Sequence, residues 1–208
     1  YTLAVLMPML GAQILTFGMQ SASVYLGAQE KFGFGLILRA NLLMALVISA
    51  LFLLLGVPLV ITMGEDLFVG LPTGVLFLGL SAFPATFGIT TLPALAQAAN
   101  AFRAYNLFLL TQPVTQLVLA LCIVSAGGSV GALVLSFALS SWTAFLTMSV
   151  WMTRNWGLGT GSVRPFFRAA IGYGMLSHLG NIATLLNYRA VVWLSANMLG
   201  LASSGIYV

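Results

Sequence analysis

The chain has 208 residues, of which 61% are hydrophobic and 5% are charged, and its formal net charge at pH 7 is +4. Soluble domains carry about 25% charged residues, so this composition excludes a water-soluble globular fold. The few basic residues are scattered singly and form no continuous face, which argues against nucleic acid as a partner.

Long uncharged runs predict membrane-crossing helices, because a helix needs about 20 residues to cross a hydrocarbon core about 30 Å thick. Only helices and closed β-barrels satisfy their backbone in lipid, and barrel strands alternate apolar with polar residues. Runs such as "LFLLLGVPLV" at 51–60 do not alternate. We therefore expect an all-α polytopic membrane bundle with six crossings at about 1–27, 36–62, 73–99, 105–125, 131–152 and 168–198, and the start of a seventh near residue 202.

The connections between these helices divide the charged residues unequally. Successive connections lie on opposite sides of a membrane, and Lys and Arg gather on the cytoplasmic side. One side holds Glu65 and Asp66 and no basic residue. The other side, which we expect to be cytoplasmic, collects six of the seven basic residues: Lys31, Arg39, Arg103, Arg154, Arg164 and Arg168. The longest connection, "TRNWGLGTGSVRP" at 153–165, lies there too and is the best candidate for a boundary between two bundles.

Two stretches on the basic side are loosely alike: "AQEKFGFGLILRANLLMAL" at 28–46 and "AQAANAFRAYNLFLLTQPV" at 96–114. Each runs from a helix ending near Ala-Gln, through a basic turn, into a helix with an early asparagine. This pattern is typical of a duplicated helix hairpin. Chance similarity in a chain of such biased composition is the alternative.

Polar side chains inside the crossings mark helix contacts or water-filled paths. In the first crossing, Gln13 and Gln20 lie about 20° apart on a helical wheel and so share a face. In the fourth crossing, Gln112 and Gln116 lie one turn apart around Pro113. These four glutamines are candidate cavity residues, and hydrogen bonding between packed helices is the alternative for each.

The sixth crossing carries a polar stripe, with Leu176 and Leu179 on the opposite side. The stripe covers about 140° of a helical wheel, and its members are Ser177, His178, Asn181, Thr184, Tyr188 and Arg189. Leu185 and Asn187 break the pattern. We expect the stripe to face water or polar protein and take His178, Asn181, Tyr188 and Arg189 as candidate substrate-binding residues. Packing is the alternative for His178, because a metal site would need further His, Cys or acidic ligands nearby.

Arg189 is the only charged residue between Arg168 and the end of the chain. A guanidinium at a helix centre costs about 2.5–3.5 kcal/mol on insertion scales, so this position needs a reason. A cavity-facing arginine that binds an anionic ligand is one interpretation. Snorkelling to the interface, or pairing with a segment outside this sequence, is the other.

The sequence contains no constellation of catalytic residues. There are no paired carboxylates, no nucleophile with a base, and no glycine-rich phosphate loop. We therefore expect a protein that is not an enzyme and that needs no metal and no cofactor. The chain begins at Tyr1 in sequence that is already apolar and ends on "SSGIYV", which indicates a piece of a longer protein.

The sequence resembles the polysaccharide and O-antigen flippases, or teichoic-acid type exporters, of the multidrug/oligosaccharidyl-lipid/polysaccharide exporter superfamily. The strongest likeness lies in "RPFFRAAIGYGMLSHLGNIATLLNYRAVVWLSANMLGLASSGIYV" at 164–208, with a basic start, a glycine-rich helix opening and an "NYR" core. "LAQAANAFRAYN" at 95–106 and "FGMQSASVYLGAQEK" at 17–31 are similar to the family's helix ends and basic turns. The likeness spans the chain, but its motifs are degenerate.

The resemblance implies a transporter of about 12–14 helices in two lobes around a central cavity. Residues 1–153 would be most of the N-terminal lobe without its first helix, 154–164 the cytoplasmic linker, and 165–208 the start of the C-terminal lobe. It also implies the function: moving an undecaprenyl-linked oligosaccharide, such as a lipopolysaccharide O-antigen precursor, from the cytoplasmic to the outer leaflet by alternating access. Expected partners are this lipid-linked substrate, the lipid bilayer of a bacterial or archaeal plasma membrane, and glycan polymerase or assembly proteins of the cell envelope.

By motif position, the resemblance makes Arg189 the residue that faces the substrate pyrophosphate, where a guanidinium fork would bind phosphate oxygens. Family members often place an acid soon after "NYR", whereas this chain has Ala190, Val191 and Val192 there. A multidrug or cation antiporter of the same superfamily is the alternative, but it would need an acid within a crossing. A second alternative is a membrane assembly protein that transports nothing.

Overall fold

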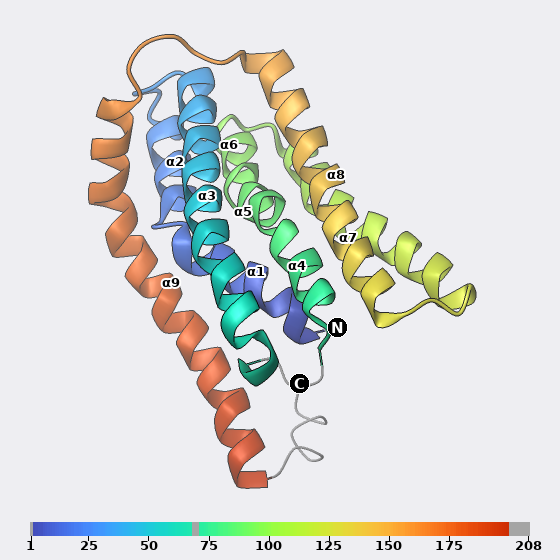
Figure 1. The fold of residues 1–208 in the computed structure, drawn as a ribbon. Helices are drawn as coiled ribbons and strands as arrows, with labels where there is room; N and C mark the ends of the chain where they lie inside the picture. The colour runs from blue at the N-terminus through green and yellow to red at the C-terminus, as the bar shows by residue number, and fades with distance from the viewer. Residues whose placement is uncertain (1, 68–70, 200–208) are drawn as a thin grey trace.

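The computed structural model describes residues 2–67 and 71–199, with side chains described over 4–64 and 71–184. These residues form a helical bundle without strands, which confirms the all-α prediction (Figure 1). The helices are α1 (Thr2–Leu15), α2 (Met19–Ala28), α3 (Phe34–Leu67), α4 (Thr73–Ser81), α5 (Phe83–Thr91), α6 (Pro93–Ala98), α7 (Phe102–Ser125), α8 (Val130–Trp156) and α9 (Arg164–Leu199).

Each of the six expected crossings corresponds to a helix or to a run of helices. Four are long and apolar enough to span a bilayer: Phe34–Gly64, Thr73–Ala98, Phe102–Ser125 and Val130–Trp156. α1 and α2 together occupy the range expected for the first crossing and α9 that expected for the sixth, but neither is among these four spans. The expected seventh helix lies outside the described residues. The chain is therefore a helical membrane protein.

The boundaries of the second crossing differ from the expectation. α3 continues to Leu67 rather than ending near residue 62, so Glu65 and Asp66 belong to its last turn and not to a connection. An α-helix tolerates acids in its sequence when they reach the membrane surface, and the apolar part of α3 ends at Gly64. Hydropathy alone marks where the apolar run ends and not where the helix ends.

The first crossing is not one helix, because the chain breaks between α1 and α2. Phe17 and Gly18 both adopt left-handed backbone, with φ of 47° and 70°. A left-handed pair cannot continue a right-handed helix. The Thr16 hydroxyl donates to the Gln13 carbonyl at 3.1 Å and helps to close the last turn of α1. A Cβ on Gly18 would overlap the Gly174 carbonyl oxygen of α9, so the break lies directly against that helix.

The third crossing, α4 to α6, is the central element of the bundle. Its helices are interrupted at Ala82 and Leu92, and Pro84 and Pro93 occupy the first turns of α5 and α6. Proline lacks the N–H that a continuous helix would need, which explains the two interruptions. Of its apolar window, 61% is buried inside the protein, against 6% for α7. α7 therefore lies at the periphery of the described bundle, where most of its leucines are exposed.

Three connections that contain a basic residue, or have one on the helix ends beside them, meet at one end of the bundle, uppermost in Figure 1. They are the α2–α3 turn at 29–33, the α6–α7 turn at 99–101 and the α8–α9 connection at 157–163. The rings of Phe34 and Trp156, one at the start of α3 and one at the end of α8, lie 5.4 Å apart there. We call this end the basic end.

Arg39 of α3 holds the α8–α9 connection against the bundle. Its guanidinium donates one hydrogen bond to the Gly159 carbonyl at 2.8 Å and another to the Gly161 carbonyl. The backbones of Gly35 and Gly159 lie so close that a Cβ on Gly35 would sit 2.8 Å from the Gly159 nitrogen. The expected linker is thus fastened to the first five crossings at the point where α9 begins.

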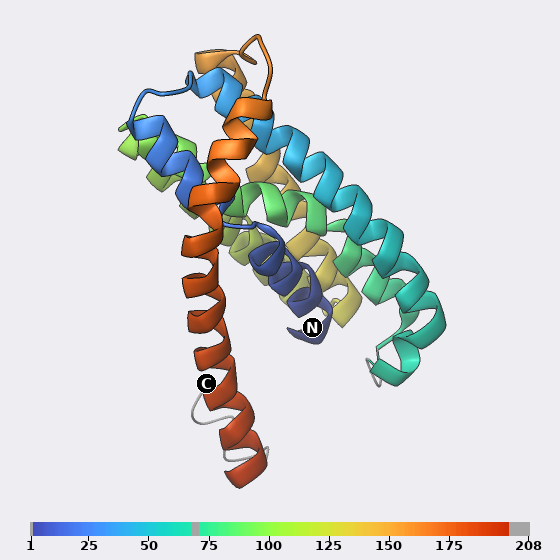
Figure 2. The ribbon, with the colours of Figure 1, turned by 90° about the vertical axis from the view of Figure 1, so that its left-hand side faces the viewer.

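α9 packs on α2 and α3 near the basic end and then leaves the bundle, as Figure 2 shows. Leu176 and Leu179 of α9 are 76% and 60% exposed. Ser177 and His178, on the polar side of the same helix, turn toward α2 and the break before it. This part of α9 thus has an exposed apolar side, while on its other side Ser177 meets a hydroxyl and His178 meets the Phe17 ring.

Candidate binding groove

α2 and α9 meet through a short series of small and aromatic side chains. The hydroxyl of Ser177 donates to that of Ser21 across 2.8 Å. About one turn toward the basic end, the rings of Tyr25 and Tyr173 stack with centroids 4.1 Å apart and an interplanar angle of 2°. The contact thus joins the second half of the first crossing to the start of the sixth.

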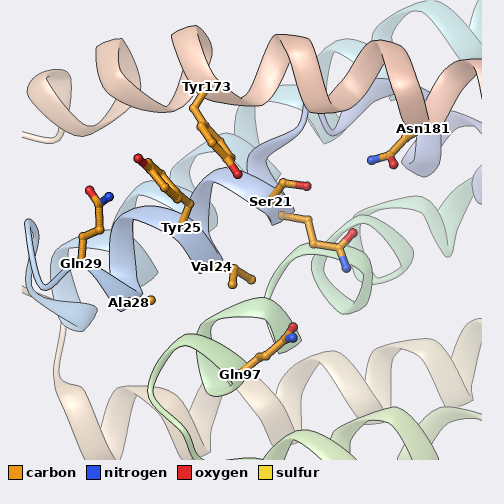
Figure 3. A pocket seen from close by; sticks show the side chains of 9 residues that line it. Ser21, Val24, Tyr25, Ala28, Gln29, Gln97, Tyr173 and Asn181 are labelled. Carbon is orange, nitrogen blue, oxygen red and sulfur yellow. The ribbon is translucent and has the colours of Figure 1, made fainter.

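An open cavity of about 620 Å³ lies beside this contact, between α2, α6 and α9. Figure 3 shows the Tyr25 and Tyr173 rings at one wall, with Gln97 reaching in from α6 and Asn181 from α9. We call this cavity the amide groove, because four of its polar side chains are carboxamides. Its lining residues are Gln20, Ser21, Val24, Tyr25, Ala28, Gln29, Gln97, Tyr173 and Asn181.

The four carboxamides of the groove are free to bind a ligand. Gln20, Gln29, Gln97 and Asn181 are all exposed, and none of them hydrogen-bonds to another side chain or backbone group of the described part of the chain. Each carboxamide offers two donor hydrogens and an acceptor oxygen. From Gln20 to Gln29 the groove follows α2 for about 14 Å, at 1.5 Å per residue.

A second hollow of about 360 Å³ continues the groove toward the basic end. The two hollows share Val24, Ala28 and Gln97. Glu30 and Asn100 line the outer part, and both have left-handed backbone with φ of 54°. Glu30 is exposed and forms no ion pair within the described residues, and the next residue in the chain, Lys31, is exposed as well.

Two of the predicted site residues, Gln20 and Asn181, lie in the groove. Gln13 is exposed on α1 and does not line it. Gln112 and Gln116 lie on the peripheral helix α7, where Nε2 of Gln112 donates to the side-chain Oε1 of Gln116 at 2.8 Å. Within the described part of the protein, these three glutamines are therefore separate from the groove.

His178 does not face the groove either. It is 4% exposed and lies against Phe17 with ring centroids 5.9 Å apart. Its Nδ1 is buried without a hydrogen-bond partner in the described part of the chain. The packing alternative therefore describes this residue better than a ligand-binding role. The side chains of Tyr188 and Arg189 lie outside the described residues, although the backbone of both belongs to α9.

Sequence reasoning did not select five of the residues that line the groove: Ser21, Tyr25, Gln29, Gln97 and Tyr173. A signal for two of them was present in the two similar stretches at 28–46 and 96–114. Both stretches contain an Ala-Gln pair at a helix end, and those glutamines, Gln29 and Gln97, line the same groove.

Two apolar hollows of about 350 and 440 Å³ lie elsewhere on the bundle and meet at Phe17. Their walls are apolar residues from α1, α2, α3, α9 and the break at Phe17, with no hydrogen-bonding side chain among the residues that line them. A further hollow of about 510 Å³ lies on α8 and is lined in part by Thr147, Arg154 and Asn155. Among the described residues no group of three His, Cys, Asp or Glu side chains could hold a metal ion. The amide groove is the polar hollow that lies between distant helices and holds two of the predicted site residues.

Comparison of the chain with protein-family models, with curated proteins and with solved structures found no match. The groove and its chemistry consequently carry the functional argument.

Proposed function

We propose that the protein is a membrane flippase that moves a lipid-linked oligosaccharide from the cytoplasmic to the outer leaflet by alternating access. The observation that supports this most directly is the amide groove. It places four exposed carboxamides in an open cavity between α2, α6 and α9, in a bundle that has long apolar helices. A ligand with a polar glycan and an apolar anchor needs both surfaces at once.

The position of the groove fits loading from the cytoplasm. Gln29 and Gln97 lie at helix ends near the basic end, which we assign to the cytoplasm by the positive-inside rule. Gln20 and Asn181 lie deeper along α2 and α9. A glycan entering at the basic end would meet the amides in succession, while its lipid anchor stays in the membrane.

The contact between α2 and α9 supplies a place for the conformational change. In our proposal α2 belongs to one lobe and α9 begins the other, joined by the connection that Arg39 holds. Alternating access requires the lobes to separate at one end and close at the other. The Ser21–Ser177 and Tyr25–Tyr173 pairs would break and re-form in that cycle.

A flipping assay tests the proposal. The full-length protein is reconstituted in vesicles with a fluorescent undecaprenyl-diphosphate trisaccharide, and the loss of fluorescence to a membrane-impermeant reductant reports exposure on the outer leaflet. We expect faster exchange than in protein-free vesicles, and slower exchange with Gln97→Leu or Asn181→Leu. Asn106→Leu, an exposed amide on α7 outside the groove, is the matched control.

Two outcomes would count against a flippase. Exchange no faster than in protein-free vesicles would contradict transport of this substrate class. Normal lipid exchange in both groove variants would contradict the assignment of the groove as the substrate-binding site. An assembly protein that transports nothing predicts the first outcome, and a cation antiporter predicts ion flux without exchange of the lipid.

A further inference from the structure

The amide groove carries no charged side chain among the residues that line its main cavity. Its hydrogen-bonding groups are four carboxamides, two phenols and the hydroxyl of Ser21. The nearest charge in the continuous groove is negative, at Glu30 in the outer hollow. Uncharged hydrogen-bonding groups together with an acid in the outer hollow favour a narrower class of ligands than a polar groove would in general.

A carboxamide both donates and accepts hydrogen bonds, and so does a sugar hydroxyl. A carboxylate or phosphate only accepts, so it would use the NH₂ groups of Gln20, Gln97 and Asn181 and not their amide oxygens. The residues that line the main cavity also offer an anion no cation, and hydrogen bonds from neutral donors stabilise an anion less than those from charged donors. A cationic ligand would likewise find no acid within the main cavity. The amides therefore match an uncharged ligand rich in hydroxyl groups.

The tyrosine pair adds a second element of recognition. Tyr25 and Tyr173 are each 42% exposed, and they stack on one another with an interplanar angle of 2°. The stack holds both rings in fixed orientation, so ligand binding costs little additional side-chain entropy. An exposed aromatic surface beside hydrogen-bonding amides suits a sugar ring, which has apolar C–H faces and a polar rim.

Glu30 opposes acidic ligands at the mouth. It makes no ion pair with another described residue, and it lines the hollow that opens the groove toward the basic end. A carboxylate passing it would meet a like charge at the entrance of the groove. Like charges within a few ångströms are unfavourable even with substantial screening.

We propose that the amide groove is a saccharide site selective for a neutral segment of glycan, and that Glu30 at its mouth discriminates against acidic sugars. This inference rests on the proposed function for its biological substrate, but binding itself can be measured without transport. It leaves the phosphate groups of a lipid-linked substrate to be bound outside the groove.

The test uses two soluble probes with the same sugar backbone: trigalacturonate, which is anionic, and its fully methyl-esterified form, which is neutral. Binding of each to the purified full-length protein in lipid nanodiscs is measured by calorimetry. We expect the ester to bind at least tenfold more tightly than the acid. Gln97→Leu and Asn181→Leu should each weaken ester binding by about three- to tenfold, the effect of one lost hydrogen bond, while Asn106→Leu leaves it unchanged.

Two further variants test how charge in the groove affects binding. Glu30→Gln removes the carboxylate and keeps the shape, so it should raise the affinity for the acid while leaving that for the ester unchanged. Gln97→Glu keeps the size of the side chain in the groove but adds a second negative charge, and it should weaken binding of the acid further. Melting temperatures of the variants in nanodiscs establish that each is folded.

The results separate this inference from the proposed function. Equal affinity for acid and ester, or no binding of either, would overturn the neutral saccharide site. Ester binding that is sensitive to Gln97→Leu, in a protein that does not accelerate lipid exchange, would support the site and contradict the flippase. Accelerated lipid exchange with no saccharide binding in the groove would support the flippase and contradict the saccharide site.

Discussion

The hydroxyl oxygens of Ser21 and Ser177 lie 2.8 Å apart and join α2 to α9 across 156 positions of sequence. Together with the stacked rings of Tyr25 and Tyr173, this pair forms the contact beside which the amide groove lies. The groove therefore exists only while α2 and α9 are together. That dependence makes the contact the first target for experiment.

A disulfide across this contact should stop transport. With Cys122 replaced by serine, Ser21→Cys and Ser177→Cys should form a bond under mild oxidation, because their present side-chain distance is close to the separation that a disulfide needs. If α2 and α9 must part in each cycle, oxidation should arrest lipid exchange and reduction should restore it. Mass spectrometry of the intact protein measures the cross-link.

The control pair is Ser21→Cys with Leu176→Cys, since Leu176 is 76% exposed and lies on the opposite face of α9. We expect no cross-link there. Full transport by the cross-linked Ser21–Ser177 variant would show that the two helices stay together throughout the cycle.

Gly174 should tolerate no larger residue. A Cβ at this position would lie 2.8 Å from the Phe17 carbonyl oxygen and 3.0 Å from that of Gly18, and backbone cannot move aside as a side-chain tip can. We expect Gly174→Ala to destabilise the protein by about 1–3 kcal/mol, the usual cost of overpacking. Thermal unfolding in detergent measures the change.

Gly180 is the matched control on the same helix, because a Cβ there meets nothing within 4 Å. Alanine favours helix by up to about 1 kcal/mol over glycine, so Gly180→Ala should be neutral or stabilising. Equal losses in the two variants would mean that α9 does not pack on the α1–α2 break as described.

Arg39 should control access to the α8–α9 connection. Its two hydrogen bonds to Gly159 and Gly161 carbonyls use the fork of the guanidinium. Arg39→Ala should expose the connection to chymotrypsin at Leu158, which is 50% exposed, and raise the cleavage rate several-fold. Arg39→Lys should protect the connection from cleavage only in part, because an ammonium group lacks the forked donors of a guanidinium.

Arg103→Ala removes a basic residue from the α6–α7 side of the same end and provides the control for net charge. Its cleavage rate should equal that of the unchanged protein. Cleavage that rises equally in the Arg39 and Arg103 variants would assign the effect to charge and not to the hydrogen bonds.

His178→Leu should leave transport intact and keep or raise stability. The imidazole is 4% exposed with an unpartnered Nδ1 among the described residues, and a buried polar atom without a partner costs about 1–3 kcal/mol. Asn181→Leu, one turn further along α9, should instead reduce lipid exchange. Loss of lipid exchange in a stable His178→Leu protein would contradict a packing role and indicate that His178 takes part in substrate binding.

The fold was largely predictable because apolar runs of membrane length dominate this sequence. The break at Phe17 and Gly18 was not, because its cause is tertiary: the left-handed pair brings backbone against Gly174, more than 150 residues away. A pattern within one crossing contains no sign of that contact. The same reason explains why Gly18 did not stand out among the glycines of the chain.

The groove was predictable only in part. Gln20 and Asn181 stood out because they interrupt apolar helices, whereas Gln29 and Gln97 lie at helix ends, where polar residues are ordinary. Three helices that are distant in sequence bring them together. Gln112 stood out for the same reason as Gln20, yet its partner is Gln116 on its own helix. A polar residue within a crossing is thus a candidate site residue, and the packing of the helices determines whether it lines the groove.

Arg189 should affect transport without affecting saccharide binding. In α9 it follows Asn181 by eight residues, which places its backbone about 12 Å further from the basic end than the groove's deepest amide. If its guanidinium binds the phosphates of the substrate, Arg189→Ala should slow lipid exchange by about 10- to 100-fold, the effect of a lost charged hydrogen bond. Arg189→Lys should retain part of the rate, since lysine keeps the charge and loses the fork. Both variants should bind the neutral ester as the unchanged protein does, and full exchange by both would exclude a phosphate contact at this residue.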